Sequence, residues 1–234
     1  MSAAIRQKRV YEPPAAEDGL RVLVTRFWPR GVRRAAVDLW LRVLGTPPEM
    51  LKSYQAGRLT YADFARDYRA WLASSPEAAP ALADLVRLVT DGDITLLTSF
   101  SDLTRSHVPV LAAAVAAQAL ARLGDAALRR TPRFAAILFY SPQVAAFAGG
   151  GEHPDDLLAI AAGIAATGRG VAIVGTEEAE DRSPQCYLEL YSVLGFPAGP
   201  VGAVVAESGQ IGRFAPAEVE AIRDVAERAA RILA

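Results

Sequence analysis

Arg21-Val-Leu-Val-Thr-Arg-Phe-Trp-Pro-Arg-Gly31 is the stretch that decides how the first half of this chain folds. Its four apolar or β-branched residues, 22–25, predict a short buried strand over residues 21–26, which runs directly into a turn stiffened by proline. Because open parallel sheets bind ligands beyond the carboxyl ends of their strands, we expect Arg26, Trp28 and Arg30 to belong to a binding site. The alternative is that both arginines are solvated, or are paired with acids of the preceding loop, namely Glu12, Glu17 and Asp18.

A second predicted strand, over residues 94–98, also ends in polar side chains. If the two strands are parallel, Thr25 and the arginines meet Thr98, Ser99 and Asp102 at one edge of the sheet. The arginines would then hold a phosphate or carboxylate, and Trp28 would stack on a base or sugar. Asp102 and His107 would move protons. Alternatively, Ser101 or Asp102 caps the long helix that follows, and His107 is a partly buried residue of that helix.

Helix signals fill the space between these strands. A short helix is predicted over residues 37–44, and Thr60 with Asp63 predicts the start of another. The aromatic stripe of this second helix is interpreted as core, with Tyr68 and Arg69 able to reach the rim of the pocket; the stripe is Tyr61, Phe64, Tyr68 and Trp71. A further helix ends at Asp91-Gly92.

The second half has a different order of elements. Strands are predicted at residues 134–140, 145–148, 171–175, 187–194 and 201–208, with helices at 155–166 and from Pro216 onward. Adjacent strands joined by turns predict an antiparallel sheet covered by helices. We therefore expect an α/β protein with two domains, a compact two-layer or three-layer α/β domain over 1–115 and a second domain over 116–234, with the boundary somewhere within 108–130.

Composition narrows the class of protein. The 234 residues are 52% hydrophobic and 22% charged, which permits a normal core. The segment 1–34 has eight basic and three acidic residues, which favours an anionic partner, while the interleaved acids elsewhere argue against a broad nucleic-acid surface. A single cysteine, Cys186, and the lack of a signal-peptide core favour the cytoplasm.

No membrane span, metal or cofactor is expected. The most apolar stretch, residues 108–123, is interrupted by Pro109, Gln118 and Arg122. His107, His153 and Cys186 are too far apart in sequence to show metal-ligand spacing.

Two glycine-rich or acidic segments invite other interpretations. Gly149-Gly150-Gly151 lacks the lysine and hydroxyl residue of a phosphate-binding loop, so we interpret it as a loop before a capped helix. The acidic loop 177–181 is either solvated or a lid over a pocket of the second domain.

Several motifs of the first half resemble those of an uncharacterised bacterial family, domain of unknown function 488, over residues 4–118. The resemblance rests on 5–14, 18–31, Leu39-Trp40-Leu41, the spacing of Phe64, Tyr68, Arg69 and Leu72, Thr95-Leu96-Leu97, and Asp102 followed by His107. It implies a compact α/β fold with no established activity.

This chain departs from that family pattern at three places. The family usually has an acid at the positions of Thr25 and of Trp71, and a tyrosine or alanine pair in place of Thr98 and Ser99. If those acids serve chemistry, this chain has lost or changed it.

The second half resembles a small GAF domain, a ligand-binding sensor fold. The resemblance rests on Thr167-Gly-Arg-Gly-Val171, Gly195-Phe-Pro197, Val201 to Ser208, and Phe214 to Val219 opening a terminal amphipathic helix. No cofactor motif accompanies it.

Three functions follow from these patterns. The first is a sensor or regulatory protein, dimeric through alanine-rich terminal helices, that binds an anionic small molecule in a pocket of the first domain. The second is a hydrolase or transferase acting on a nucleotide-like or phosphorylated substrate. The third is a nucleic-acid-associated protein, for which binding would depend steeply on salt.

Overall fold

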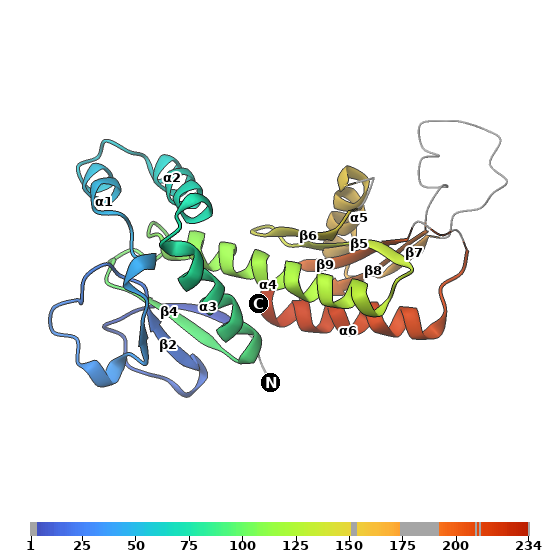
Figure 1. Cartoon of the computed structure of the whole chain (residues 1–234), viewed down its shortest axis with the longest axis horizontal. Coiled ribbons are helices and arrows are strands. Elements are labelled where there is room, and N and C mark those ends of the chain that lie inside the picture. Colours follow the sequence, from blue (N-terminus) through green and yellow to red (C-terminus); the bar gives the residue numbers. More distant parts are fainter. Residues whose placement is uncertain (1–3, 151–153, 174–191, 209, 211, 234) are drawn as a thin grey trace. The chain divides into compact units, whose positions relative to one another are not determined.

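The computed structural model describes residues 4–150, 154–173, 192–208, 210 and 212–233. Contacts between Cα atoms divide the chain into two compact units, Met1–Ala116 and Ala117–Ala234. The division falls within the long helix α4, so the two units share one continuous helix (Figure 1). The molecule mixes helices with one parallel and one antiparallel sheet, so each unit is described separately.

The first unit is built on a parallel four-stranded sheet in the order β1-β4-β2-β3. Its strands are β1 (Ile5–Arg9), β2 (Leu20–Leu23), β3 (Leu39–Trp40) and β4 (Ile94–Thr98). All three pairings are parallel, and β2 and β4 pair with Leu23 beside Leu97. Every residue of β4 is buried, as expected for a continuous apolar strand in a sheet covered on both faces.

Helices and short 3-10 turns connect and cover these strands. They are η1 (Ala16–Asp18), η2 (Arg34–Ala36), η3 (Arg42–Leu44), α1 (Pro48–Gln55), α2 (Tyr61–Ser74), α3 (Ala78–Asp91) and α4 (Val108–Arg130). The prediction that Thr60 starts a helix is confirmed, since its hydroxyl accepts a hydrogen bond from the Asp63 amide and the Asp63 carboxylate bonds back. The predicted end of α3 at Asp91 is also confirmed.

The short helix predicted over residues 37–44 is wrong. Leu39 and Trp40 instead form β3, which pairs with Val22 and Leu23 and leaves only a 3-10 turn after it. Its approach is fixed by Asp38, whose carboxylate accepts a hydrogen bond from the Arg21 amide. Pairing with a buried strand outweighs the weak helix propensity of this segment.

The predicted cap of α4 at Ser101 or Asp102 is also wrong. The helix begins at Val108, and its first amide donates to the Ser106 hydroxyl at 3.2 Å. Asp102 does not cap this helix; its carboxylate instead accepts hydrogen bonds from Thr104 and closes a local turn.

A buried ion-pair cluster stabilises the middle of this sheet. The Asp18 carboxylate, 1% exposed, pairs with both Lys8 of β1 and Arg21 of β2. The Arg21 guanidinium also donates to the backbone oxygens of Ala36 and Glu12, so it is fully engaged while 4% exposed. The Thr95 hydroxyl of β4 donates to the Asp18 carbonyl. This cluster therefore joins three neighbouring strands through η1.

The second unit has a five-stranded sheet in the order β6-β5-β9-β8-β7, in which every pairing is antiparallel. Its elements are β5 (Phe134–Tyr140), β6 (Ala145–Gly149), α5 (Pro154–Thr167), β7 (Val171–Ile173), β8 (Ser192–Ala198), β9 (Gly202–Ser208) and α6 (Pro216–Leu233). The prediction of an antiparallel sheet with helices is thus confirmed.

Helices cover both faces of this sheet (Figure 1). Leu157, Ala161 and Ile164 of α5 form a core with Leu138 and Val205. The buried residues of α6 face β8 and β9, and Leu233 lies against Gly202. The apolar stripe of α6 is therefore already used inside its own unit.

The largest difference from the predicted strand boundaries in this unit lies at β8. The strand expected over residues 187–194 is described only from Ser192, and it continues through Gly195-Phe196-Pro197 to Ala198. Residues 177–181, His153 and Cys186 lie outside the described residues.

Helix α4 is long and apolar enough to cross a membrane by length and composition. More than half of that stretch is buried within the protein, which is what the core helix of a soluble protein shows. Its Gly124 faces Ala148 and Phe139, where a Cβ atom would be only 2.5 Å and 2.9 Å from their side chains.

Candidate functional site

The residues that the sequence predicts to form a site follow strands at one edge of the parallel sheet. We call this the carboxyl edge and define it as residues 10–12 and 24–30, which follow β1 and β2, and residues 98–102, which begin with the last residue of β4. The three segments begin side by side, because the amides of Val10 and Val24 donate to Thr98 and Leu97 of the central strand. Parallel pairing therefore brings the arginine turn and the serine–aspartate segment to the same edge.

Trp28 anchors the turn after β2. Its indole nitrogen donates to the Val32 carbonyl at 3.0 Å, and its ring meets Trp40 edge-on at 5.5 Å. The Arg34 guanidinium covers the indole face at 4.1 Å. A ligand that stacked on this face would have to displace Arg34, so the indole of Trp28 is not open for stacking.

Trp28 was predicted to stack on a ligand, but the aromatic residue of this turn that is exposed to solvent is Phe27. Its side chain is 73% exposed, whereas Trp28 packs onto the cluster of Val10, Leu23 and Leu97. Trp28 is held inward by its hydrogen bond to Val32 and by its contacts with Trp40 and Arg34, and the adjacent Phe27, in a bend of the chain, is left facing solvent. The Phe-Trp pair was the signal that should have identified Phe27.

Arg26 and Arg30 have no carboxylate partner among the residues that the structure describes. Two of the three acids named as alternative partners are engaged elsewhere: Glu12 accepts from the Arg9 amide at 2.8 Å, and Asp18 lies in the ion-pair cluster. The third, Glu17, forms no ion pair with either arginine in the described part of the chain. Arg30 is exposed and Arg26 is half-buried. The edge therefore presents positive charge at an open surface.

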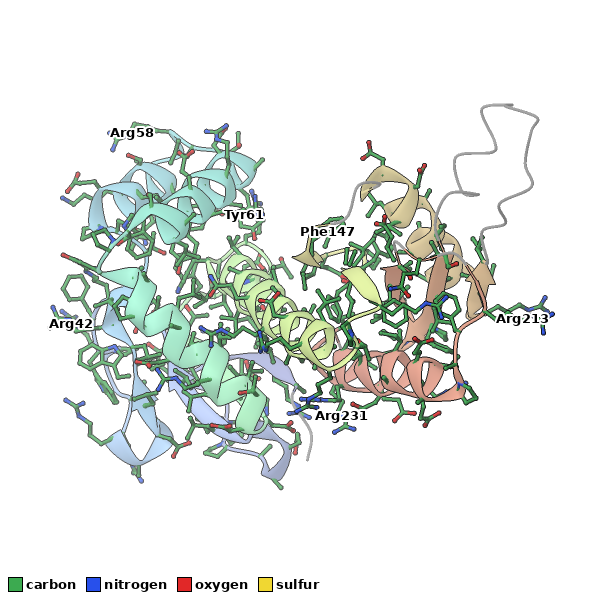
Figure 2. The ribbon with its side chains drawn as sticks, turned by 45° about the vertical axis from the view of Figure 1, so that its right-hand side comes forward. Arg42, Arg58, Tyr61, Phe147, Arg213 and Arg231 are labelled. Carbon is green, nitrogen blue, oxygen red and sulfur yellow. The ribbon has the colours of Figure 1, made fainter. Side chains whose placement is uncertain are left out.

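Arginines dominate the whole segment around this turn. Residues 24–42 contain five arginines and one acid, Asp38. Arg42, labelled in Figure 2, extends away from the first unit into solvent. This excess raises the local potential and attracts anions.

The hydroxyl residues of the edge mainly shape its backbone. Thr25 is buried and donates to the Phe27 carbonyl at 2.8 Å. Thr98, also buried, accepts from the Phe100 amide at 3.3 Å, and Ser99 is exposed. Of the predicted hydroxyl contacts, Ser99 is the one left open to solvent.

A close backbone approach fixes the position of Arg26. A Cβ atom on Gly45, at the end of η3, would lie 2.1 Å from the Arg26 amide nitrogen and 2.6 Å from the Thr25 carbonyl carbon. Backbone atoms cannot give way as a flexible side chain can. Glycine is thus required at position 45 for steric reasons alone.

Asp102 and His107 were predicted to exchange protons, and the structure does not bring them into contact within its described part. The Asp102 carboxylate accepts from the amide and hydroxyl of Thr104, which lowers the pKa of this exposed group. His107 is fully buried, with Nε2 at 2.6 Å from the Val24 carbonyl, so Nε2 carries the proton. Its Nδ1 has no partner among the described residues.

The surroundings of His107 make it a weak base. Burial lowers the pKa of His107 to about 4, against the opposing effect of the hydrogen bond to Val24. The rings of Tyr68 and Phe100 pack against it at 5.4 Å and 5.8 Å. General bases work best with a pKa near the working pH, so neither Asp102 nor His107 is tuned for that role at neutral pH.

Tyr68 and Arg69 separate in the structure. Tyr68 is fully buried and donates its hydroxyl to the Leu44 carbonyl, and burial raises its pKa. Arg69 is exposed on α2. Of this pair, only Arg69 is accessible to a ligand.

The described residues do not indicate a metal centre. Within the part of the chain that the structure describes, no group of three or more histidine, cysteine, aspartate and glutamate side chains is arranged to hold a metal ion.

Known proteins match the first unit. Residues 4–134 match the model of a family described as the inactive DUF488-N3 subclade, which is more than half of the chain. The uncharacterised protein YeaO of Escherichia coli K12 is 36% identical over 110 residues, covering 46% of this chain and 93% of YeaO. The uncharacterised protein Rv3073c of Mycobacterium tuberculosis H37Rv is 34% identical over 110 residues, covering 46% of this chain and 90% of its own.

A solved structure matches half of the chain weakly. A GAF domain/HD domain protein from Geobacter sulfurreducens aligns over 50% of this chain and 89% of its own, with a TM-score of 0.36 and 19% identity. That similarity is too low to assign a fold. The family match covers more than half of the chain and is sufficient to assign the family. Through residues 4–134, this chain belongs to the inactive DUF488-N3 subclade.

Proposed function

We propose that the first unit binds an anionic small molecule at the carboxyl edge and acts as a sensor or regulatory unit, without catalysing a reaction of that molecule. The observation that carries this proposal is the pair of arginines, Arg26 and Arg30, that follow β2 without a carboxylate partner in the described chain. Guanidinium groups bind phosphate and carboxylate in bidentate fashion.

Three further observations favour binding over catalysis. Asp102 and His107 are not hydrogen-bonded to each other and have pKa values lowered by their surroundings. The family pattern that the first half resembles implies an acid at the position of Thr25. The family itself is described as inactive. The alternative, a hydrolase or transferase, lacks a positioned base in this arrangement.

We further propose that the second unit is a GAF-like sensor domain in a cytoplasmic protein. Its support is the antiparallel sheet β6-β5-β9-β8-β7 with α5 and α6 on its faces. A homodimer remains part of this proposal, but the apolar stripe of α6 packs on β8 and β9. Dimerisation would therefore use another surface.

The arginine pair is tested by thermal unfolding in the presence of anionic ligands. All three tryptophans, Trp28, Trp40 and Trp71, lie in the first unit, so selectively excited tryptophan fluorescence reports on that unit. Inorganic phosphate, simple sugar phosphates and nucleoside monophosphates serve as the ligand panel. A ligand present at about 100 times its Kd should stabilise the unit by about 2.7 kcal/mol.

The double variant Arg26→Ala/Arg30→Ala should lose this stabilisation. Arg87→Ala removes the same kind of charge from α3, where the guanidinium pairs with exposed Asp84, and should keep it. An unchanged melting shift in the double variant, or no shift with any ligand in the wild type, contradicts the proposal.

A further inference from the structure

Phe27 is the most exposed large apolar side chain in the described part of the chain, at 73%. A single exposed aromatic ring is not unusual on a protein surface. This ring is unusual in its setting, because it lies between Arg26 and Arg30, both without carboxylate partners among the described residues. An apolar flat surface and two positive charges are therefore presented within one turn.

The backbone around Phe27 is held from both sides. The Thr25 hydroxyl donates to the Phe27 carbonyl, and Trp28 is fixed by its hydrogen bond to Val32 and by Arg34 on its face. Pro29 is buried. The ring is thus displayed by a preorganised turn, which reduces the entropy cost of using it for binding.

We propose that Phe27 stacks on the base of a nucleotide whose phosphate is held by Arg26 and Arg30. This inference rests on the proposed function and names the ligand class for the same site. Nucleotides combine a flat π-face with an anion, and bases stack on aromatic side chains with little dependence on sequence. A sugar phosphate would satisfy the arginines and leave the ring unused.

The same chemistry is offered by a free mononucleotide and by a nucleotide within a single strand. A second exposed aromatic residue, Tyr11, follows β1 and is 51% exposed, with the Arg9 guanidinium 5.6 Å from its ring centroid. Since β1 and β2 flank β4, the two strands that these aromatic residues follow lie about 10 Å apart. The experiment therefore includes both sources.

Binding of AMP, ribose 5-phosphate and a short single-stranded oligoadenylate to the full chain is measured by calorimetry. In the wild type, AMP should bind about 5- to 150-fold more tightly than ribose 5-phosphate, the range expected from stacking one base. Phe27→Leu should remove this difference by weakening AMP alone. Phe27→Trp should retain it, because it restores a π-face.

The controls separate stacking from general effects. Phe147→Leu changes another exposed aromatic residue, 43% exposed in β6 and labelled in Figure 2, and should leave all affinities unchanged. Arg26→Gln should weaken AMP and ribose 5-phosphate equally. Tighter binding of the oligoadenylate than of AMP, lost in Phe27→Leu, supports the inference with a single strand as the source; the reverse order supports it with the free nucleotide.

Two results would overturn the inference in distinguishable ways. If AMP and ribose 5-phosphate bind equally and Phe27→Leu changes neither, base stacking is wrong while anion binding stands. If no phosphorylated ligand binds, the proposed function fails together with the inference.

Discussion

Replacing Asp18 with alanine is expected to lower the free energy of unfolding of the first unit by about 3 kcal/mol, because removing one partner leaves a buried charge uncompensated. The Arg21 guanidinium is 4% exposed and would keep only its bonds to the Ala36 and Glu12 carbonyls. Lys8 is partly exposed and can turn to water, which keeps the loss at the lower end of the range for buried pairs.

Urea unfolding followed by tryptophan fluorescence measures this loss. Asp84→Ala is the matched control, since it breaks the exposed pair with Arg87 on α3 and should change the free energy of unfolding little. Asp18→Asn separates charge from shape, because it retains the volume of the side chain. Equal destabilisation by Asp18→Ala and Asp84→Ala would show that the cluster does not hold the sheet together.

Acid is expected to destabilise the first unit through His107 before the carboxylates act. In the unfolded chain this histidine takes up a proton near pH 6.5, whereas in the folded chain its pKa is about 4. The unfolded state therefore binds more protons in this interval, so stability is complete above pH 6.5 and falls as the pH approaches 4. The difference of roughly 2.5 pKa units corresponds to about 3 kcal/mol.

His107→Gln isolates this effect. A glutamine amide can still donate to the Val24 carbonyl, as Nε2 does at 2.6 Å, but it does not titrate. The free energy of unfolding should fall less steeply between pH 6.5 and 4 in the variant than in the wild type. The pKa of Asp18 is lowered, since hydrogen bonds from Lys8 and Arg21 outweigh the opposing effect of burial; its stabilisation is thus present above its usual pKa of 3.8 and is lost below it. Parallel pH profiles for the wild type and His107→Gln would contradict the prediction that His107 destabilises the protein in acid.

Elements with strong local signals could be predicted from the sequence. The apolar run at 94–98 became β4, and the capping box at Thr60 and the stop at Asp91 bound α2 and α3 as expected. These signals are local, since each depends on side chains within one turn or strand. The prediction of a helix over residues 37–44 was wrong because β3 forms only through its pairing with β2, and no local sequence pattern indicates that pairing.

The sequence could predict where the candidate site lies in the fold, but not which of its side chains face solvent. The order of polar residues after two apolar strands located the carboxyl edge, since parallel pairing brings strand ends together. Which side chains face outward was set by tertiary packing: Trp28 found Trp40 and Arg34, and Phe27 was left outside. The engagement of Asp102 with Thr104 likewise depends on a turn that helix-capping patterns do not anticipate.

The contact of Gly45 with the Arg26 backbone limits how this edge can change over time. Gly45 lies nineteen positions from Arg26 in the sequence and has no side chain. Its close packing nevertheless sets the position of the main chain that carries the Arg26 guanidinium. Adaptation to a different ligand would therefore proceed by exchanging the side chains at 26, 27 and 30 on an invariant main-chain frame. Position 45 would tolerate no such drift, and a directed-evolution library that holds it constant would sample specificity without losing the scaffold.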